Sequence, residues 1–391
     1  MYSRKIYPLI KKHLKERQIT VLTGMRRTGK TTIVKELLGE INSGNKLYLD
    51  LERLDNRDIF SQRNYEAIIN SLKQLGLDAQ KPATIAIDEI HLAPALPSAL
   101  KYLYDHYQIK FIVTGSSSYY LKNFFSESLA GRKKVFELYP LDFFEFLTFK
   151  NVSHATEPFI GKKFNSAEFN RLSGYYEEYI NYGGFPEVVL AGKAAAKKDL
   201  LYDIFDSFVK IDVKTLADFR DISNLEKLLK MMAARVGTKL DYAKLSRLTG
   251  ISRPTVVNYI DFLEKTYMIF RLPVYSKSPD REIVKAAKLY CRDNGLLGIL
   301  ADISGGAKFE NAVFNQLKAM GELKYYSLKT GKEIDFIMNG QAAFEVKESP
   351  LPNDLKVVRE LASAVKIKSG RLIGRYQVPN FDDYIWAGEI R

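Results

Sequence analysis

Short apolar runs alternate with helical stretches over residues 18–150. The runs "ITVLT", "LYLDL", "TIAID", "FIVTG" and "VFEL" begin at positions 19, 47, 84, 111 and 135. Apolar strands that alternate with helices are typical of a parallel sheet covered on both faces. The pattern therefore predicts a parallel α/β domain. Ahead of it, four apolar residues at helical spacing predict an amphipathic helix: Ile6, Leu9, Ile10 and Leu14.

The pattern changes twice further along the chain. Residues 165–235 have the spacing of helices, interrupted by the conspicuous break "GGFPEVV" at 183–189. Residues 238–275 have the pattern of a compact helix-turn-helix, and from about residue 285 strands and helices alternate again. There are no internal repeats. The sequence therefore predicts an α/β domain, a helical region, a helix-turn-helix and a second α/β domain.

The helix-turn-helix segment covers residues 241–276. Gly250 is expected at the turn, Ser252 at the cap of the second helix, and a short wing strand after that helix. The segment resembles a winged helix. Bound to DNA, it would face the groove with the side chains that lie off its buried stripe, and the alternative is a winged helix that only packs against protein. The candidate DNA contacts are Arg253, Thr255, Asn258 and Tyr259.

Composition narrows the class of protein. The 391 residues carry a formal charge of +13, which favours an anionic partner such as DNA, although a basic surface can also serve only solubility. The single cysteine, Cys291, excludes an intramolecular disulfide, and four scattered histidines form no zinc-like cluster. No apolar run approaches the ~18 residues of a membrane span, and the N-terminus lacks a signal peptide's features. We therefore expect a cytoplasmic protein with no membrane partner.

The strongest local signal is a glycine-rich segment between the first apolar run and a helical stretch. It matches the pattern GxxxxGK[ST], followed by a second threonine, in the strand–loop–helix context of a phosphate-binding loop. The glycines let backbone N–H groups point at phosphate oxygens, the lysine neutralises the β- and γ-phosphates, and the first threonine hydroxyl ligates Mg²⁺. The second threonine is expected near the α-phosphate. The segment predicts a site for ATP and Mg²⁺ at Gly24, Met25, Arg26, Arg27, Thr28, Gly29, Lys30, Thr31 and Thr32.

Two acids follow the third apolar run. Asp88 is expected to hold the Mg²⁺ shell, and Glu89 to polarise the attacking water. Either acid alone would also serve as a helix cap, but the pair after a buried strand favours the catalytic interpretation. In the following "TGSSS", Ser116 is expected to contact the γ-phosphate or the water, and the alternative is that these serines cap the next helix.

Arg132 follows Gly131 just before the fifth apolar run. By analogy, an arginine at this edge of the domain reaches the γ-phosphate of a neighbouring subunit and stabilises charge in the transition state. The alternative is a surface arginine in the basic cluster "RKK".

The last domain carries a spaced set of charged residues. A predicted helix places Glu310 on its apolar stripe, where an unpaired charge is costly to bury, so that Glu310 needs a partner or faces a site. The strands "EIDFIM" and "AAFEVK" follow. A helix glutamate, a strand aspartate and then Glu-x-Lys is an order that resembles the PD-(D/E)xK nucleases. The predicted site consists of Glu310, Asp335, Glu345 and Lys347.

These residue types suit a metal-dependent reaction. Asp335 and Glu345 offer the hard oxygens that Mg²⁺ prefers, a metal-bound water would attack the phosphodiester, and Lys347 would orient that water. The alternative is a pair of ordinary half-buried strands in an inactive binding module. The hairpin loop distinguishes the two. A two-residue turn at Asn339-Gly340 would place Asp335 and Glu345 on opposite faces, whereas an odd-length loop of Met338, Asn339 and Gly340 would place them on one face.

The motifs together resemble a group of AAA+ ATPases that carry a restriction-endonuclease-like C-terminal domain. "GMRRTGKTT", "IAIDEIH", "VTGSSS", "LAGR" and "YPLDFFEF" occur in that group's order and spacing, and "GGFPEVV" looks like its helical-lid motif. Asp142 departs from the serine expected in "PLSF". The resemblance implies the strand order 5-1-4-3-2 and a homo-oligomer. It also implies an AAA+ domain at 1–160, a helical lid at 161–235, a winged helix at 236–276 and a nuclease-like domain at 277–391.

The sequence therefore predicts an ATP-hydrolysing AAA+ protein that acts on DNA, with a C-terminal domain that is a Mg²⁺-dependent nuclease. The alternative is an ATP-gated switch or scaffold whose C-terminal domain is inactive and binds DNA or a protein partner. A third interpretation is an ATPase that acts on a protein, with a basic surface that only confers solubility.

Overall fold

The computed structural model describes residues 4–115, 129, 131–155, 160–161, 163–213, 222–276, 278, 280, 282, 285–328 and 330–391. These residues form two compact units. The first unit takes in the described residues up to 139, together with 207–213 and 265–267, and the second unit takes in the others. Each unit has a sheet and a core of its own. The four-domain division along the sequence stays a prediction.

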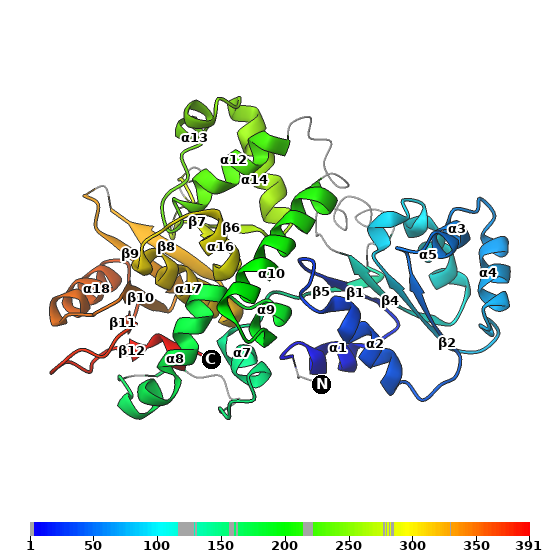
Figure 1. Ribbon diagram of the computed structural model, residues 1–391, viewed down its shortest axis with the longest axis horizontal. Coiled ribbons are helices and arrows are strands. Elements are labelled where there is room, and N and C mark those ends of the chain that lie inside the picture. Colours follow the sequence, from blue (N-terminus) through cyan, green and yellow to red (C-terminus); the bar gives the residue numbers. More distant parts are fainter. Residues whose placement is uncertain are drawn as a thin grey trace. The chain divides into compact units, whose positions relative to one another are not determined.

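A five-stranded sheet forms the centre of the first unit (Figure 1). Its neighbouring strands are parallel, and their order, β2-β3-β4-β1-β5, is the predicted order 5-1-4-3-2 read from the other edge. Each strand begins within two residues of an apolar run named above. The bounds are β1 Ile19–Thr23, β2 Lys46–Asp50, β3 Ala83–Asp88, β4 Ile109–Gly115 and β5 Lys133–Glu137.

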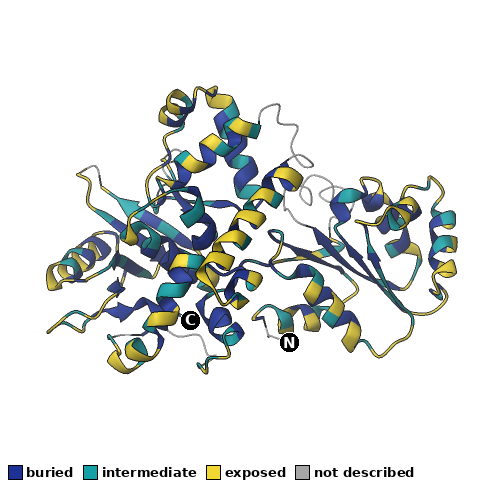
Figure 2. Ribbon diagram, viewed as in Figure 1, coloured by how far each residue is buried: buried dark blue, intermediate teal, exposed yellow. Residues whose placement is uncertain are grey.

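Helices cover both faces of this sheet. On one face, α1 (Tyr7–His13) and α2 (Lys30–Glu40) pack Ile10, Val34 and Leu37 against the strands. On the other face lie α3 (Leu54–Phe60), α4 (Tyr65–Gln74) and α5 (Leu96–His106). Figure 2 shows the central strands buried and the outer helix faces exposed. Each fully buried Leu or Ile contributes roughly 1.5–3 kcal/mol, so this core holds the carboxyl ends of β1, β3 and β4 firmly at one edge.

Helices begin the second unit. They are α7 (Phe143–Phe149), α8 (Ser166–Tyr182), α9 (Pro186–Leu190), α10 (Ala194–Ser207) and, later in the chain, α16 (Asn294–Leu300). Asp142, the departure from the expected serine, caps α7: its carboxylate accepts the backbone N–H groups of Phe144 (3.0 Å) and Glu145 (2.9 Å). Any side chain with a suitable oxygen at this position can cap the helix, so the departure leaves the local fold intact.

The glycines of "GGFPEVV" end α8 where the chain passes close to two other segments. Gly183 has a φ of +72°, and a Cβ there would lie 2.3 Å from an Asp293 carboxylate oxygen. A Cβ on Gly184 would lie 2.1 Å from the carbonyl oxygen of Leu141. The Gly184 N–H donates to Asp293 at 2.8 Å, and burial raises the pKa of Asp293 to about 6. The motif is therefore a close backbone crossing that admits no side chain.

A mixed five-stranded sheet forms the other part of the second unit, in the order β12-β11-β10-β9-β8. Strands β8 to β10 are antiparallel neighbours, whereas β10 to β12 are parallel. Helix α18 (Pro352–Ala364) packs on this sheet, and α17 (Gly305–Met320) stacks Phe314 on Tyr290, with ring centroids 4.2 Å apart. The strands are β8 Leu323–Ser327, β9 Glu333–Met338, β10 Ala342–Lys347, β11 Ser369–Gly374 and β12 Ile385–Trp386, and the short helix η3 is Ala387–Glu389.

Three helices and a two-stranded antiparallel sheet complete the second unit. The helices are α12 (Ile222–Ala233), α13 (Tyr242–Thr249) and α14 (Arg253–Lys265), and the strands are β6 (Ile269–Leu272) and β7 (Lys288–Cys291). Gly250, with a φ of +74°, ends α13 as the turn pattern predicts. Among the described residues, no helix combines the length and apolar character that a membrane crossing requires.

Candidate nucleotide-binding site

The predicted phosphate loop joins the carboxyl end of β1 to the first turn of α2. Gly24 has a φ of +151°, and a Cβ there would lie 2.0 Å from the carbonyl oxygen of Leu138, so only glycine fits. Gly29, with a φ of +97°, is the N-cap of α2. The Thr28 hydroxyl donates to the Met25 carbonyl at 2.9 Å, and Arg4 donates to the Thr28 carbonyl at 2.9 Å. The loop is thus built around the N-terminus of a helix, where anions bind.

Lys30 lies inside this loop. Its Nζ donates to the carbonyl oxygens of Gly24 and Met25, both at 2.8 Å, and the side chain is buried. Burial lowers the pKa of Lys30, and the charges of Glu89, Asp212 and Asp88 act in the opposite direction. A buried cation at this position is suited to a strongly anionic ligand, because phosphate charge restores the lost stabilisation. In contrast to Lys30, Thr32 is exposed, and its role near the α-phosphate stays a prediction.

Asp88, at the end of β3, accepts hydrogen bonds from three side chains of the site. Its Oδ2 accepts hydrogen bonds from the Thr31 hydroxyl at 2.6 Å and from the Tyr48 hydroxyl at 2.8 Å, and its Oδ1 accepts one from the Thr114 hydroxyl. Burial and the hydrogen bond to Asp88 raise the pKa of Tyr48. The adjacent hydroxyl of Thr31 and carboxylate of Asp88 are the hard oxygen donors that Mg²⁺ prefers, so these residues fit the metal.

Glu89 has a backbone conformation that is uncommon for a residue other than glycine. Its φ is +56°, and its N–H donates to the Thr114 hydroxyl at 3.1 Å. The carboxylate Oε2 lies 3.1 Å from Nδ1 of the buried His91, in the short helix η1 (Ile90–Leu92). Burial opposes ionisation of Glu89, but the contact with His91 and the charge of Lys30 lower its pKa to about 2. A strained backbone and a fixed carboxylate are typical of a catalytic position.

A second acid reaches the loop from far along the chain. Asp212, in the first unit's segment η2 (Phe208–Val213), lies with its carboxylate oxygens 3.3 Å from Nε of Arg26. Asp212 is buried, and Arg26 also lies 3.8 Å from Glu52. The loop position Arg26 is therefore held by an acid that is 186 residues away in the sequence. Arg27, by contrast, is exposed and has a φ of +60°.

The two other residues predicted for this site are Ser116 and Arg132. Ser116 lies outside the residues that the structure describes. Arg132 lies just before β5, at the amino-terminal ends of the strands, whereas the phosphate loop lies at their carboxyl ends. Its Nε and Nη2 donate to Asp105 at 3.0 and 3.1 Å. A role on a neighbouring subunit, which stays a prediction, would require this ion pair to open.

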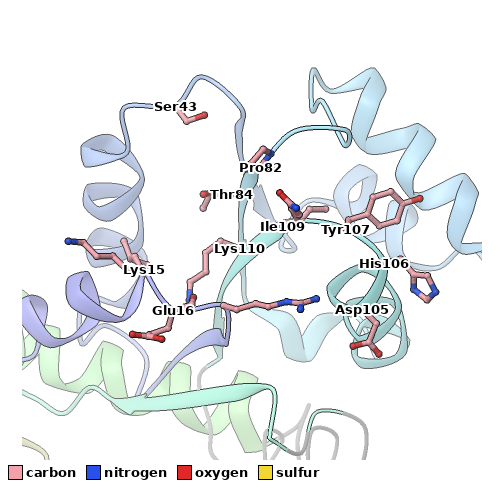
Figure 3. A pocket seen from close by; sticks show the side chains of 14 residues that line it. Lys15, Glu16, Ser43, Pro82, Thr84, Asp105, His106, Tyr107, Ile109 and Lys110 are labelled. Atoms are coloured by element: carbon pink, nitrogen blue, oxygen red, sulfur yellow. The ribbon is translucent and has the colours of Figure 1, made fainter.

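A cavity of about 670 Å³ lies at the same amino-terminal ends of the strands, where β3 and β4 begin (Figure 3). Lys110 lines it together with Asp105 and Lys15. The Lys110 Nζ donates to the carbonyl oxygens of His13, Glu16 and Gln18, and burial lowers its pKa to about 8. All three N–H groups of this ammonium are engaged by the protein, so the cavity offers no free buried cation to an anionic ligand.

The predicted DNA-contact residues divide on α14. Arg253 and Asn258 are exposed and Thr255 is half-buried, with its hydroxyl 2.7 Å from that of Ser252. The prediction for Tyr259 is wrong, because this residue is only 5% exposed and belongs to the buried side of the helix. The exposed part of the helix is therefore narrower than the pattern predicted.

The four residues of the predicted nuclease site lie in one cluster in the second unit. The cluster also contains a buried cation, Lys288, that was not predicted. Lys288, which is 2% exposed, places its Nζ 2.9 Å from Glu333 and 3.4 Å from Asp335. The other Asp335 oxygen accepts the Val346 N–H at 3.0 Å. Glu310 accepts the Tyr290 hydroxyl at 2.6 Å. Lys347 donates to Glu345 at 2.8 Å.

The carboxyl groups of this cluster repel one another. Burial first, and then the charge of Asp335, raise the pKa of Glu310 to about 8 and that of Glu345 to about 7. The charge of Lys288 acts in the opposite direction on both groups. Lys288 is therefore the cation that balances the cluster, and sequence patterns gave no sign of it.

These residues do not fit a divalent metal as they are arranged. Both oxygens of Asp335 are engaged by protein donors, and the ammonium of Lys288 stands beside one of them. Within this cluster of described residues, Oε2 of Glu345 is buried without a hydrogen-bond partner. In the part of the chain that the structure describes, no group of three or more His, Cys, Asp or Glu side chains is placed to hold a metal.

The hairpin loop has the odd length that one shared face requires. Asn339, Gly340 and Gln341 form it, with φ values of +51° and +66° at the first two, and Met338 pairs with Ala342. This loop is one residue further along than the odd-length alternative of Met338, Asn339 and Gly340. Continuing this register places Asp335 opposite Glu345. The strand geometry therefore permits the carboxylates of Asp335 and Glu345 to approach. The cation beside Asp335 is the ammonium of Lys288.

A parallel sheet with a glycine-rich phosphate loop between its first strand and the following helix is the arrangement of a P-loop domain. In agreement, residues 16–147 match a family described as an AAA domain, and residues 173–306 match a family described as a domain of unknown function. An uncharacterised protein of Haemophilus influenzae is 29% identical over 360 residues, which are 86% of this chain and 85% of that protein. One of Methanocaldococcus jannaschii is 27% identical over 372 residues, 91% of this chain and 81% of that protein.

Solved structures add little to this assignment. The ADP form of the Aeropyrum pernix ORC2 protein is similar to this chain with a TM-score of 0.38 and 10% identity, over 75% of this chain and 90% of that one. A likeness this weak supports no inference about function. The class of the first unit therefore rests on the family match and on the geometry of its own residues.

Proposed function

We propose that this protein binds ATP at residues 24–31 and hydrolyses it with Glu89 as the residue that orients and polarises the attacking water. The observation that carries the proposal is the convergence at one sheet edge of Lys30, the Thr31–Asp88 pair and the ionised Glu89. Thr31 and Asp88 would hold Mg²⁺, which neutralises phosphate charge when bound. Lys30 binds the β- and γ-phosphates, and Thr114 fixes the backbone of Glu89.

The experiment that tests the proposal is calorimetric titration of MgATP into the full chain and into Lys30→Ala. Lys30 is the buried cation of the loop, so its removal is expected to abolish binding. Lys101→Ala is the matched control, because this lysine is an exposed residue of α5 in the same unit. We also propose that the protein assembles as a homo-oligomer in which Arg132 acts on the neighbouring subunit. Arg132→Ala with unchanged turnover at concentrations that give full assembly would exclude that role.

We propose DNA as the partner of the second unit. Two observations support this partner. The helices α12, α13 and α14 are followed by the antiparallel pair β6-β7, an order that resembles a winged helix, and Arg253 and Asn258 are exposed on α14. The chain's net charge of +13 favours the same class of partner. ATP turnover that increases when DNA is added would support this partner over a protein substrate.

For the C-terminal domain we propose a nuclease-like fold that does not cleave DNA. The mixed sheet with α17 and α18, and the cluster around Asp335, support the fold, whereas the Lys288 ammonium opposes metal binding. We expect no DNA cleavage by the full chain in Mg²⁺ or Mn²⁺. Cleavage that is lost in Asp335→Ala would contradict this proposal and favour the nuclease, and cleavage that survives the substitution would come from a contaminant.

A further inference from the structure

A cleft of about 690 Å³ lies in the second unit, between the end of α12, the start of α13, the first residue of α14 and strand β7. Its polar lining consists of Arg235, Thr238, Lys239, Asp241, Tyr242, Lys244 and Arg253. Four of these side chains are cations and one is an acid. The cleft is thus a concentrated positive site, and it shares Arg253 with the α14 residues that were predicted to contact DNA.

The cleft keeps an excess of positive charge, although Asp241 lines it and Glu333 lies 3.8 Å from Lys239. The Asp241 carboxylate caps α13 by accepting the Lys244 N–H at 2.9 Å. Two acids of α14, Asp261 and Glu264, are both engaged by Arg271, with contacts of 2.8 Å each. Among the described residues, neither the ammonium of Lys244 nor the guanidinium of Arg253 has an ion-pair or hydrogen-bond partner.

The remaining groups are held in place before any ligand arrives. Arg271 Nη1 donates to the Tyr242 hydroxyl at 3.4 Å, and Arg235 donates to the carbonyl oxygen of Met231 at 2.8 Å. Lys239 lies 3.8 Å from Glu333 while its side chain stays 44% exposed. Side chains that are already ordered lose less entropy when a ligand binds.

We propose that this cleft binds the phosphodiester backbone of DNA, in a manner independent of sequence. The inference rests on the proposed DNA partner and names the surface that would provide its affinity. Cations together with a tyrosine hydroxyl are the groups that contact phosphate and sugar. The larger apolar residues that line the cleft, Met232, Leu240, Leu245 and Leu289, are all buried, so it lacks the accessible apolar centre that a protein interface uses.

The test is fluorescence anisotropy of a labelled DNA duplex with the full chain over a series of salt concentrations. The cleft variant is Lys239→Ala with Lys244→Ala, and the matched control is Lys227→Ala with Lys230→Ala, two exposed lysines of α12 outside the cleft. The cleft variant is expected to bind at least about tenfold more weakly at low salt. The slope of log affinity against log salt is expected to shrink by about 2, since each phosphate contact contributes about 0.9. The control should keep the wild-type slope, and both variants the wild-type melting temperature.

The outcomes separate the cleft from the partner. A wild-type chain that does not bind duplex DNA overturns the proposed partner and the cleft with it. Wild-type binding with an unchanged slope in the cleft variant, or with equal losses in both variants, overturns the cleft alone. Poly-glutamate of matched charge that displaces the duplex as well as unlabelled DNA does would show a site for any acidic polymer and would overturn the assignment to phosphodiester.

Discussion

Glu89→Gln is expected to turn over ATP about 10²–10⁴-fold more slowly than the wild-type chain while it binds MgATP with nearly unchanged affinity. Glutamine has the shape of glutamate but lacks the charge that polarises water. The carboxylate is ionised in the native chain, because the contact with His91 and the charge of Lys30 hold its pKa at about 2 despite burial. Phosphate release under saturating MgATP measures turnover, and calorimetry measures affinity.

Asp58→Asn is the matched control for this substitution. It removes one carboxylate from an exposed position on α3 of the same unit and should leave both measurements unchanged. Glu89→Gln with full turnover would remove Glu89 from the mechanism. A loss of affinity as large as the loss of turnover would instead assign Glu89 to the binding of ATP.

Lys288→Met is expected to destabilise the second unit by about 3–5 kcal/mol, because it leaves buried carboxylates without their cation. The ammonium lies between Glu333 and Asp335 and opposes the repulsion that raises the pKa values of Glu310 and Glu345. The measurement is amide hydrogen exchange in β9 and β10, which reports the free energy of opening of that sheet without mixing in the first unit.

A second substitution identifies the cause. Asp335→Asn added to Lys288→Met removes a carboxylate and keeps an acceptor for the Val346 N–H, so it should recover much of the lost stability. Lys332→Met, at an exposed position before β9, should change nothing. If Lys288→Met left the exchange of β9 and β10 at the wild-type rate, Lys288 would not be the cation of the cluster.

Local sequence patterns predicted the parts of the nucleotide site that lie within one strand–loop–helix segment. The phosphate loop and the acids after β3 are short motifs in which spacing alone sets the geometry. Tyr48 and Asp212 were not predicted, because each reaches the site from another part of the chain and only the folded sheet brings it there. His91 lies two residues after Glu89, so the short segment "DEIH" does contain the information that these two side chains are close.

The second unit shows where pattern reasoning fails. The predicted cluster residues are assembled, but Lys288 comes from β7, 47 residues before Asp335, and no spacing rule pairs them. The pattern predicted a narrow buried stripe on α14 and placed Tyr259 outside it. The helix buries a wider face, which includes Tyr259. The sequence left a two-residue turn and an odd-length loop open for the hairpin. The structure has the odd-length loop, at a register that depends on which residues adopt positive φ.

The most direct test of the central claim is the titration of MgATP into the wild-type chain, Lys30→Ala and Lys101→Ala. If residues 24–31 form the ATP site, the wild-type and Lys101→Ala chains bind one MgATP each with the same affinity, and Lys30→Ala gives no binding heat. MgATP binding by Lys30→Ala at the wild-type affinity, or no binding by any of the three chains, would contradict the account.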